Sequence, residues 1–262
     1  MTGTSHAEVL RRPAPQLRLF DAYTVVGYGN RPPLAPALTP ADLLAEMDRC
    51  GVDEALVHTA GETASPLVTN EQVTEFCRSS SRLHPVWSVL PPQTGEMEPK
   101  QLFLGMRQHR VRALAAWPDE HRYILNGLTM GAILEPMLER RIPLFVRGGG
   151  ALWERITHLL EEFPALVVVA CEYGCWGQDR YIRPLMDHFE HFYIETSNLE
   201  LDGGIPSLVR RYGGGRILFG SAYHRRPMGG SSLLLRNLDI DDKDKTLIGH
   251  GNLERLLKEA RL

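Results

Sequence analysis

The feature of this sequence that most constrains the fold is a repeated alternation between short apolar runs and segments with helical spacing. The apolar runs predict strands at residues 17–26, 52–59, 86–90, 111–116, 143–147, 166–171, 192–195 and 217–219. Between them, apolar residues spaced three or four apart predict helices at residues 40–50, 70–80, 100–109, 130–140, 152–162, 183–188 and 206–212. Apolar strands that alternate with helices are typical of a parallel sheet. We therefore predict an α/β fold, a closed (β/α)8 barrel, with a doubly wound open sheet as the alternative.

The length fits one domain of this kind. The chain has 262 residues, and a barrel of eight strand–helix units takes about 250. We expect a Pro-rich arm at residues 1–16 and a single barrel domain at residues 17–262, ending in two helical pieces within residues 243–262. The sequence has no GxGxxG turn after the first strand and no P-loop, so nucleotide-binding forms of the open sheet lack support.

Two local patterns make sharper predictions. The first strand alternates, and we expect one of its faces to carry Leu17, Leu19, Asp21, Tyr23 and Val25. Further on, the residues Thr39-Pro40-Ala41-Asp42 predict the start of a helix, with Thr39 as the N-cap and proline in the first turn.

Composition excludes several classes of partner. The formal net charge is −3 and the basic residues are scattered, which argues against nucleic acid and against an anionic membrane surface. No stretch approaches the roughly 18 apolar residues of a membrane span, and the N-terminus lacks the apolar core of a signal peptide. We expect a cytoplasmic protein whose four cysteines, Cys50, Cys77, Cys171 and Cys175, are reduced. Assembly into a homo-oligomer is left open.

Three segments carry a resemblance to a known family. The last predicted strand continues as Phe219-Gly220-Ser221-Ala222-Tyr223-His224, and the other two segments are residues 46–55 and 247–257. Together they resemble the amidohydrolase-2 family of metal-dependent hydrolases, over about residues 17–258. The resemblance implies a TIM-like barrel and a hydrolase or decarboxylase-type lyase activity. In that family the last strand ends in an Asp that binds metal and handles the proton of the attacking water.

The metal-binding positions of the family are changed here. Its first strand ends Asp-Ala-His-x-His, where this chain has Tyr23 and Val25 in place of the two histidines. Arg147 replaces the histidine of the fifth strand, Glu172 that of the sixth, and Ala222 the aspartate of the eighth. A catalytic divalent ion needs about three histidine or carboxylate ligands. We therefore predict no metal ion at this site and expect no cofactor.

The strand ends supply the candidate site, because active sites of this barrel lie at the carboxyl ends of its strands. The candidate catalytic residues are Glu172 and His224, and the candidate substrate-binding residues are Tyr23, His58, Trp117 and Arg147. Glu195, Arg225 and Arg226 also follow strands. Structural alternatives stand beside these roles: His58 as a core imidazole, Trp117 as a packing residue, Glu195 as the partner of an arginine, and Arg225 and Arg226 as solvated cations.

Arg147 and Glu172 end neighbouring strands and allow two interpretations. They form a structural ion pair, or Arg147 binds a substrate carboxylate while Glu172 or His224 acts as general acid or base. Three hypotheses on function follow: a metal-independent hydrolase or lyase acting on a small anionic, carboxylated substrate; a pseudoenzyme that binds a small anionic ligand or a protein partner; and a new site elsewhere, such as a thiol at Cys171 or Cys175.

Overall fold

The computed structural model describes residues 17–262 apart from 28–38, 61–64, 148, 175–176 and 200–202. The predicted arm at residues 1–16 therefore lies outside the described residues. Within them, the strands are β1 (Phe20–Val26), β2 (Glu54–Thr59), β3 (Leu83–Pro85), β4 (Trp87–Ser88), β5 (Leu114–Ala116), β6 (Leu144–Arg147), β7 (Val168–Cys171), β8 (Phe192–Glu195) and β9 (Ile217–Leu218). All paired strands are parallel.

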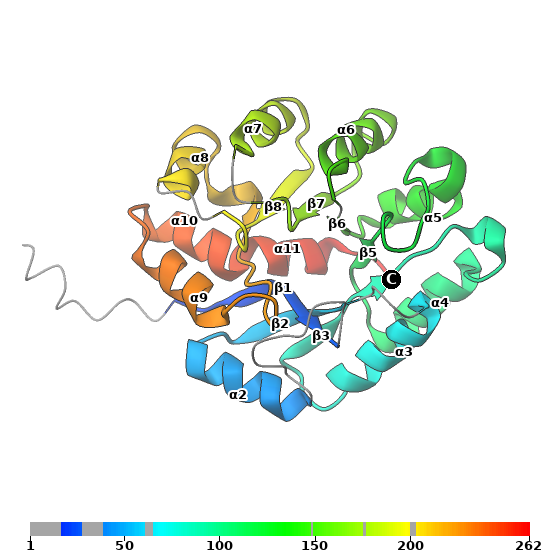
Figure 1. The fold of residues 1–262 in the computed structure, drawn as a ribbon, viewed down its shortest axis with the longest axis horizontal. Coiled ribbons are helices and arrows are strands. Elements are labelled where there is room, and N and C mark those ends of the chain that lie inside the picture. The colour runs from blue at the N-terminus through cyan, green and yellow to red at the C-terminus, as the bar shows by residue number, and fades with distance from the viewer. Residues whose placement is uncertain (1–16, 28–38, 61–64, 148, 175–176, 200–202) are drawn as a thin grey trace, which may run out of the picture.

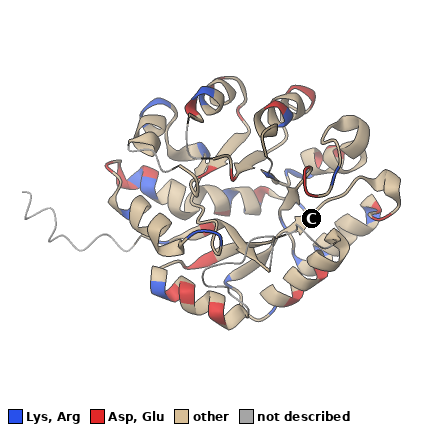
Figure 2. Cartoon of the chain, in the orientation of Figure 1, with Lys and Arg blue, Asp and Glu red and all other residues tan. Residues whose placement is uncertain are grey.

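Helices follow the strands, and most of them lie around the outside of the barrel (Figure 1). They are α2 (Pro40–Cys50), α3 (Pro66–Cys77), α4 (Pro99–His109), α5 (Gly127–Arg140), α6 (Leu152–Glu162), α7 (Asp179–His188), α8 (Gly204–Tyr212), α9 (Met228–Asn237), α10 (Asp242–Thr246) and α11 (Asn252–Glu259). The last of these, α11, crosses the middle of the view in Figure 1. Figure 2 shows Lys and Arg interspersed with Asp and Glu on these helices. None of the described helices has the length and apolar character needed to cross a membrane.

The strands join into a ring through backbone hydrogen bonds at two seams. β1–β2–β3 and β4 to β9 form two runs of paired strands. At the first seam, Val86 between β3 and β4 donates its N–H to Val57 of β2, so β3 and β4 act as one interrupted strand. At the second seam, Ala22 N lies 2.8 Å from Phe219 O, and Ala222 N lies 2.8 Å from Tyr23 O. The predicted parallel (β/α)8 barrel is confirmed.

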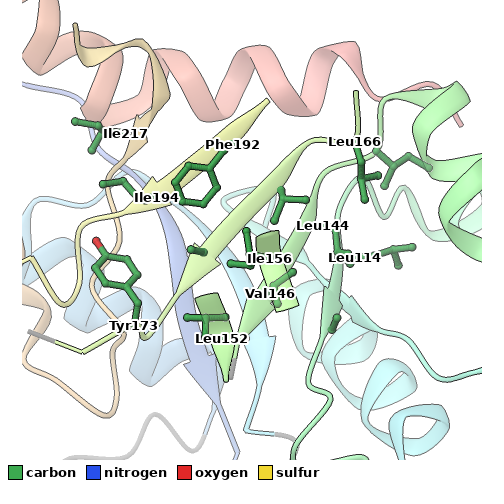
Figure 3. Close-up of a cluster of buried hydrophobic side chains, with 14 of the residues drawn as sticks. Leu114, Leu144, Val146, Leu152, Ile156, Leu166, Tyr173, Phe192, Ile194 and Ile217 are labelled. Carbon is green, nitrogen blue, oxygen red and sulfur yellow. The ribbon is translucent and has the colours of Figure 1, made fainter. Parts of the chain in front are cut away.

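Two buried layers hold the barrel together. Leu144 and Val146 of β6 point outward and pack with Leu152 and Ile156 of α6, as Figure 3 shows. Phe145, between them in sequence, belongs to a second cluster inside the barrel. Burying one such side chain contributes about 1.5–3 kcal/mol. Because strand residues alternate between the two layers, both faces of each strand are apolar, as the sequence indicated.

The amino-terminal end of the barrel is covered by α11. Arg112, which precedes β5, donates to the carbonyl oxygens of Leu257 and Ala260 at 3.0 and 2.9 Å. Leu253 and Leu256 of the same helix extend the cluster inside the barrel. This end is therefore filled by the chain itself, which leaves the carboxyl ends of the strands as the place for a site.

The prediction of a single face for the first strand is wrong. Leu19 belongs to the outer cluster, whereas Tyr23 and Val25 belong to the inner one. The register of β1 against β2 shifts between Asp21 and Thr24, and at this point the Asp21 carboxylate accepts a hydrogen bond from Tyr23 N at 3.0 Å. A bulge of this kind moves the following side chains to the opposite face.

Other local predictions had mixed outcomes. Thr39 caps α2 as predicted, with Asp42 N donating to Thr39 Oγ1 at 3.2 Å and Asp42 Oδ2 accepting from Thr39 N at 2.9 Å. The strand predicted at residues 86–90 is observed only as β4 at Trp87–Ser88, with β3 just before the predicted range, and α9 was not predicted. This helix contains Gly229 and Gly230, which favour turns in sequence-based reasoning, but it is held by the buried side chains of Met228, Ser232 and Leu235.

Candidate functional site

The predicted site residues meet at the carboxyl end of the barrel. Arg147 and Glu195 are the last residues of β6 and β8, and Glu172 follows β7. Tyr23 and His58 lie within β1 and β2, Trp117 follows β5, and His224 lies beyond β9. Parallel strands bring these positions to one end, as the sequence predicted.

The centre of the site is one carboxylate held between two guanidinium groups. Arg225 Nη1 donates to Glu172 Oε1 at 2.8 Å and to Oε2 at 2.7 Å, and Arg147 Nε forms a close ion pair with Oε2. The three side chains are only 15–21% exposed, so water screens these interactions little. Arg147 and Glu172 thus bond to each other, which agrees with the structural-ion-pair interpretation.

Two further groups complete this network. Arg147 Nη1 lies 3.3 Å from Glu120 Oε1, and its guanidinium carbon lies 4.6 Å from the centroid of the Trp117 ring, a cation–π contact. Trp117 therefore supports the arginine as well as packing in the core. Sequence reasoning missed Glu120; the only available signal was a carboxylate three residues after a strand-end tryptophan. The interpretation of Arg225 as a solvated cation is wrong.

His224 is oriented by the backbone of the first strand. Its Nδ1 lies 2.8 Å from Val25 O, and since a carbonyl can only accept, Nδ1 carries the proton in the neutral ring and Nε2 keeps a lone pair. Burial, followed by the nearby Arg225, lowers the pKa of His224 below its ordinary value. The neutral imidazole is therefore favoured near pH 7, and Nε2 is chemically suited to accept a proton.

Tyr23 and His58 form an aromatic pair inside the barrel. Their ring centroids are 4.8 Å apart, and the His58 ring meets Phe145 edge-on at 5.2 Å. His58 Nε2 lies 3.1 Å from Ala22 O, and burial lowers the pKa of this imidazole to about 3. His58 is thus neutral, with Nε2 as donor and Nδ1 as acceptor, and the interpretation of a satisfied core imidazole holds for only one of its nitrogens.

Glu195 is fully buried beneath the ion-pair network. Its carboxylate accepts from Ser197 N at 2.6 Å, from Ser197 Oγ at 2.8 Å and from Glu172 N at 3.2 Å. The predicted alternative of an arginine partner is therefore wrong. Burial raises the pKa of Glu195 to about 7 despite these hydrogen bonds. The carboxyl group also lies against the segment that follows β9, because a Cβ placed on Gly220 would lie 2.3 Å from Glu195 Oε2.

Comparison with known proteins bears on the fold. No model of a known protein family matches the sequence, and no curated protein matches it. Among solved structures, an uncharacterized TIM-barrel protein from Bordetella bronchiseptica superposes with a TM-score of 0.73 at 19% identity, covering 93% of this chain and 99% of that one. The chain is a TIM barrel.

Two other TIM-barrel neighbours are a decarboxylase and a protein assigned as an amidohydrolase without an established activity. 5-Carboxyvanillate decarboxylase from Sphingomonas paucimobilis gives a TM-score of 0.71 at 15% identity, covering 92% of this chain and 99% of the decarboxylase. A candidate amidohydrolase from Staphylococcus aureus gives 0.74 at 13% identity, covering 92% of this chain and 100% of that one. At such identities the likeness establishes the fold alone.

The residues at the strand ends of this TIM barrel do not fit a divalent metal ion. Val25 and Ala222 have no donor atom, and Arg147 places a cation on Glu172, the one carboxylate among the changed positions. Within the described part of the chain, no three His, Cys, Asp or Glu side chains are placed so that they could hold a metal ion together. The ligand set that such an ion requires is thus not supplied by these residues.

The structure argues against a reactive thiol at Cys171. This thiol is buried at the end of β7, and burial, then the nearby Glu195 and Glu172, raises its pKa well above the ordinary value. A protonated, enclosed thiol is a poor nucleophile. Cys50, Cys77 and Cys171 are free, as expected, and Cys175 lies outside the described residues.

Proposed function

We propose that this TIM barrel is a metal-independent hydrolase or lyase that binds a small carboxylated substrate at the carboxyl ends of its strands. The observation that supports this most is the clamp formed by Arg147 and Arg225 around the Glu172 carboxylate. Two guanidinium groups arranged about one carboxylate have the charge and geometry to receive another carboxylate in exchange. The decarboxylase and amidohydrolase neighbours are consistent with a small-molecule enzyme on this fold.

The clamp assigns the substrate carboxylate a particular role. Guanidinium groups stabilise the negative charge on the carboxylate in the ground state, whereas loss of CO2 moves that charge onto carbon. The clamped carboxylate is therefore an anchor and is not the group that leaves. Any bond that breaks lies elsewhere on the substrate, within reach of an acid–base group.

His224 is the proposed general base. Its Nδ1 is fixed by Val25 O, which leaves the Nε2 lone pair to take a proton from water or from a substrate carbon. Glu172 is the second acid–base candidate. The guanidinium groups occupy one acceptor site on Oε1 and two on Oε2, which leaves a lone pair on Oε1 to take a proton.

The test is turnover in a broad screen of esters, amides, lactones and carboxylates, with protein treated with a chelator and shown to be metal-free. On a substrate found in this way, His224→Gln is expected to lower kcat about 10²–10⁴-fold. The matched control is His188→Gln, an exposed histidine of α7. Undiminished kcat in both His224→Gln and Glu172→Gln would show that the assigned roles are wrong.

A pseudoenzyme is the second candidate function. Ala222 stands where the resembled family places its proton-handling aspartate, and Glu172 is already held on both oxygens. This candidate predicts that small carboxylates bind with affinities that fall in Arg225→Met, while no compound of the screen is turned over. Saturable turnover that disappears in His224→Gln excludes it.

A further inference from the structure

Among the buried polar atoms that have no hydrogen-bond partner within the described residues, three belong to aromatic side chains inside the barrel. They are the Tyr23 hydroxyl, His58 Nδ1 and Trp117 Nε1. Each side chain is 1% exposed. Most buried polar atoms in folded proteins are hydrogen-bonded, because leaving one unpaired destabilises the protein. Three such atoms in one buried region therefore require an explanation.

The three atoms lie next to the guanidinium clamp. Tyr23 pairs with His58 at 4.8 Å between ring centroids, and Trp117 lies under the Arg147 guanidinium at 4.6 Å. Tyr23 and Trp117 belong to the same buried cluster inside the barrel, together with Phe145, which the His58 ring touches. The side chains that carry the unpaired atoms are thus neighbours in the barrel interior, and Trp117 links them to the clamp through Arg147.

The donor or acceptor character of the three atoms specifies which ligand group can bind to them. The Trp117 indole N–H can only donate, and the Tyr23 hydroxyl can donate to the same acceptor. His58 Nδ1 accepts, because Nε2 donates to Ala22 O. Tyr23 and His58 come from the neighbouring strands β1 and β2, and Trp117 comes from the end of β5. The matching group carries one acceptor with two lone pairs and, on a separate atom, one N–H or O–H.

We propose that these three atoms bind a carboxamide, so that the substrate is a small monocarboxylic acid that also carries an uncharged carboxamide group. This inference rests on the proposed function, in which Arg147 and Arg225 hold the carboxylate. The amide oxygen accepts from Trp117 and Tyr23, and its N–H donates to His58. A second carboxylate does not fit, since it has no hydrogen for His58 Nδ1 and would lie desolvated in the apolar interior. A hydroxyl group can both donate and accept hydrogen bonds, but its donor and its acceptor are the same oxygen atom.

The binding test uses the full-length protein and isothermal titration calorimetry. The probes are the monoamides of malonic, succinic and glutaric acid, each compared with the acid in which isopropyl replaces the carboxamide. We expect at least one monoamide to bind about tenfold or more tightly than its isostere. The ω-hydroxy acids and the parent diacids form two further arms and are expected to bind less tightly than that monoamide. Equal affinities for every monoamide and its isostere overturn the proposal, and so does tighter binding of a hydroxy acid or a diacid.

A second test needs no ligand. Tyr23→Phe removes an unpaired buried hydroxyl, so it is expected to raise the melting temperature of the free protein by about 2 °C. The matched control is Tyr173→Phe, another buried tyrosine, whose hydroxyl donates to the Glu195 carbonyl oxygen and whose loss is expected to lower the melting temperature. Tyr23→Phe is also expected to reduce the advantage of the monoamide over its isostere at least threefold. A fall in melting temperature in Tyr23→Phe similar to that in Tyr173→Phe overturns the proposal.

The two proposals fail in different measurements. The carboxamide site is judged by the ratio of two affinities for ligands that share a carboxylate. The clamp is judged by the loss of affinity for both ligands in Arg225→Met. Unchanged affinities in Arg225→Met contradict the proposed function, whereas a ratio near one in the wild-type protein contradicts the carboxamide site alone.

Discussion

Glu172 and Arg225, 53 positions apart in the sequence, share two hydrogen bonds at 2.8 and 2.7 Å at the mouth of the barrel. The carboxylate that the sequence paired with Arg147 is thus shared between two arginines from different strand ends. This contact joins the segment after β9 to the end of β7, across the side of the barrel where β8 ends in the buried Glu195.

Breaking this contact is expected to destabilise the protein moderately. Arg225→Met leaves Glu172 with one guanidinium, and we expect the free energy of unfolding to fall by about 1–3 kcal/mol, less than for a fully buried pair. Urea denaturation measures the change. The control is Arg211→Met, which breaks an exposed pair with Asp187 at 2.9 Å and should change stability by less than about 0.5 kcal/mol. A double-mutant cycle with Glu172→Gln that shows no coupling would falsify the network.

Glu195 is expected to make stability depend on pH. Its pKa is raised from 4.5 to about 7, so the folded protein holds this proton more tightly than the unfolded chain. The resulting stabilisation is complete below pH 4.5 and is lost as the pH rises through 7, by about 3 kcal/mol. Measured against Glu195→Gln over this range, the wild-type protein should lose relative stability on going to higher pH. Parallel curves for the two proteins contradict this.

His58 is expected to make stability depend on pH in the opposite direction, with stability lost as the pH falls. Burial lowers its pKa from 6.5 to about 3, so the unfolded chain takes up this proton before the folded protein does. The stabilisation from neutral His58 is present above pH 6.5 and is lost as the pH falls toward 3. Nitrogen NMR shifts should show a neutral His58 ring with the proton on Nε2 at pH 5. A cationic ring at that pH would refute the assignment.

Gly220→Ala tests the close approach between Glu195 and the segment that follows β9. The new Cβ would lie 2.3 Å from Glu195 Oε2 and 3.1 Å from its Cβ, and a buried carboxyl cannot move aside freely. We expect a loss of about 2–4 kcal/mol in the free energy of unfolding. Gly230→Ala in α9 is the control, since nothing lies within 4 Å of its added Cβ, and alanine should stabilise that helix by about 0.5–1 kcal/mol. Similar effects at both positions would argue against a tight contact.

Metal content is a direct test of the ligand argument. Elemental analysis of protein purified without chelator is expected to show no transition metal in stoichiometric amount. Added Zn2+ or Mn2+ should leave the melting temperature unchanged, because only a metal ion that binds to the folded protein would raise the melting temperature. A stoichiometric metal that is lost in Glu172→Gln would overturn the assignment.

Much of the architecture was predictable from local patterns. Apolar runs such as residues 143–147 and 166–171 led to β6 and β7, because a strand buried on both faces must be apolar along its length. The N-cap at Thr39 was also predictable, because its hydrogen bonds are local and reach only three residues along the chain. The bulge in β1 was not predictable, because it depends on the Asp21 carboxylate, which also accepts from Ser221 N.

In the candidate site, too, some features followed from the sequence and others from the tertiary structure alone. By itself the sequence determined which side chains stand at the strand ends and that Val25 and Ala222 offer no metal ligand, because donor chemistry is a property of the residue alone. Only the tertiary structure decided that Arg225 joins Arg147 on Glu172 and that Glu195 bonds to Ser197. It also decided that, among the described residues, no arginine pairs with Glu195 and nothing pairs with the polar atoms of Tyr23, His58 and Trp117. Pairing, burial and the resulting pKa values depend on which distant segments converge, and the spacing of residues along a chain does not contain that information.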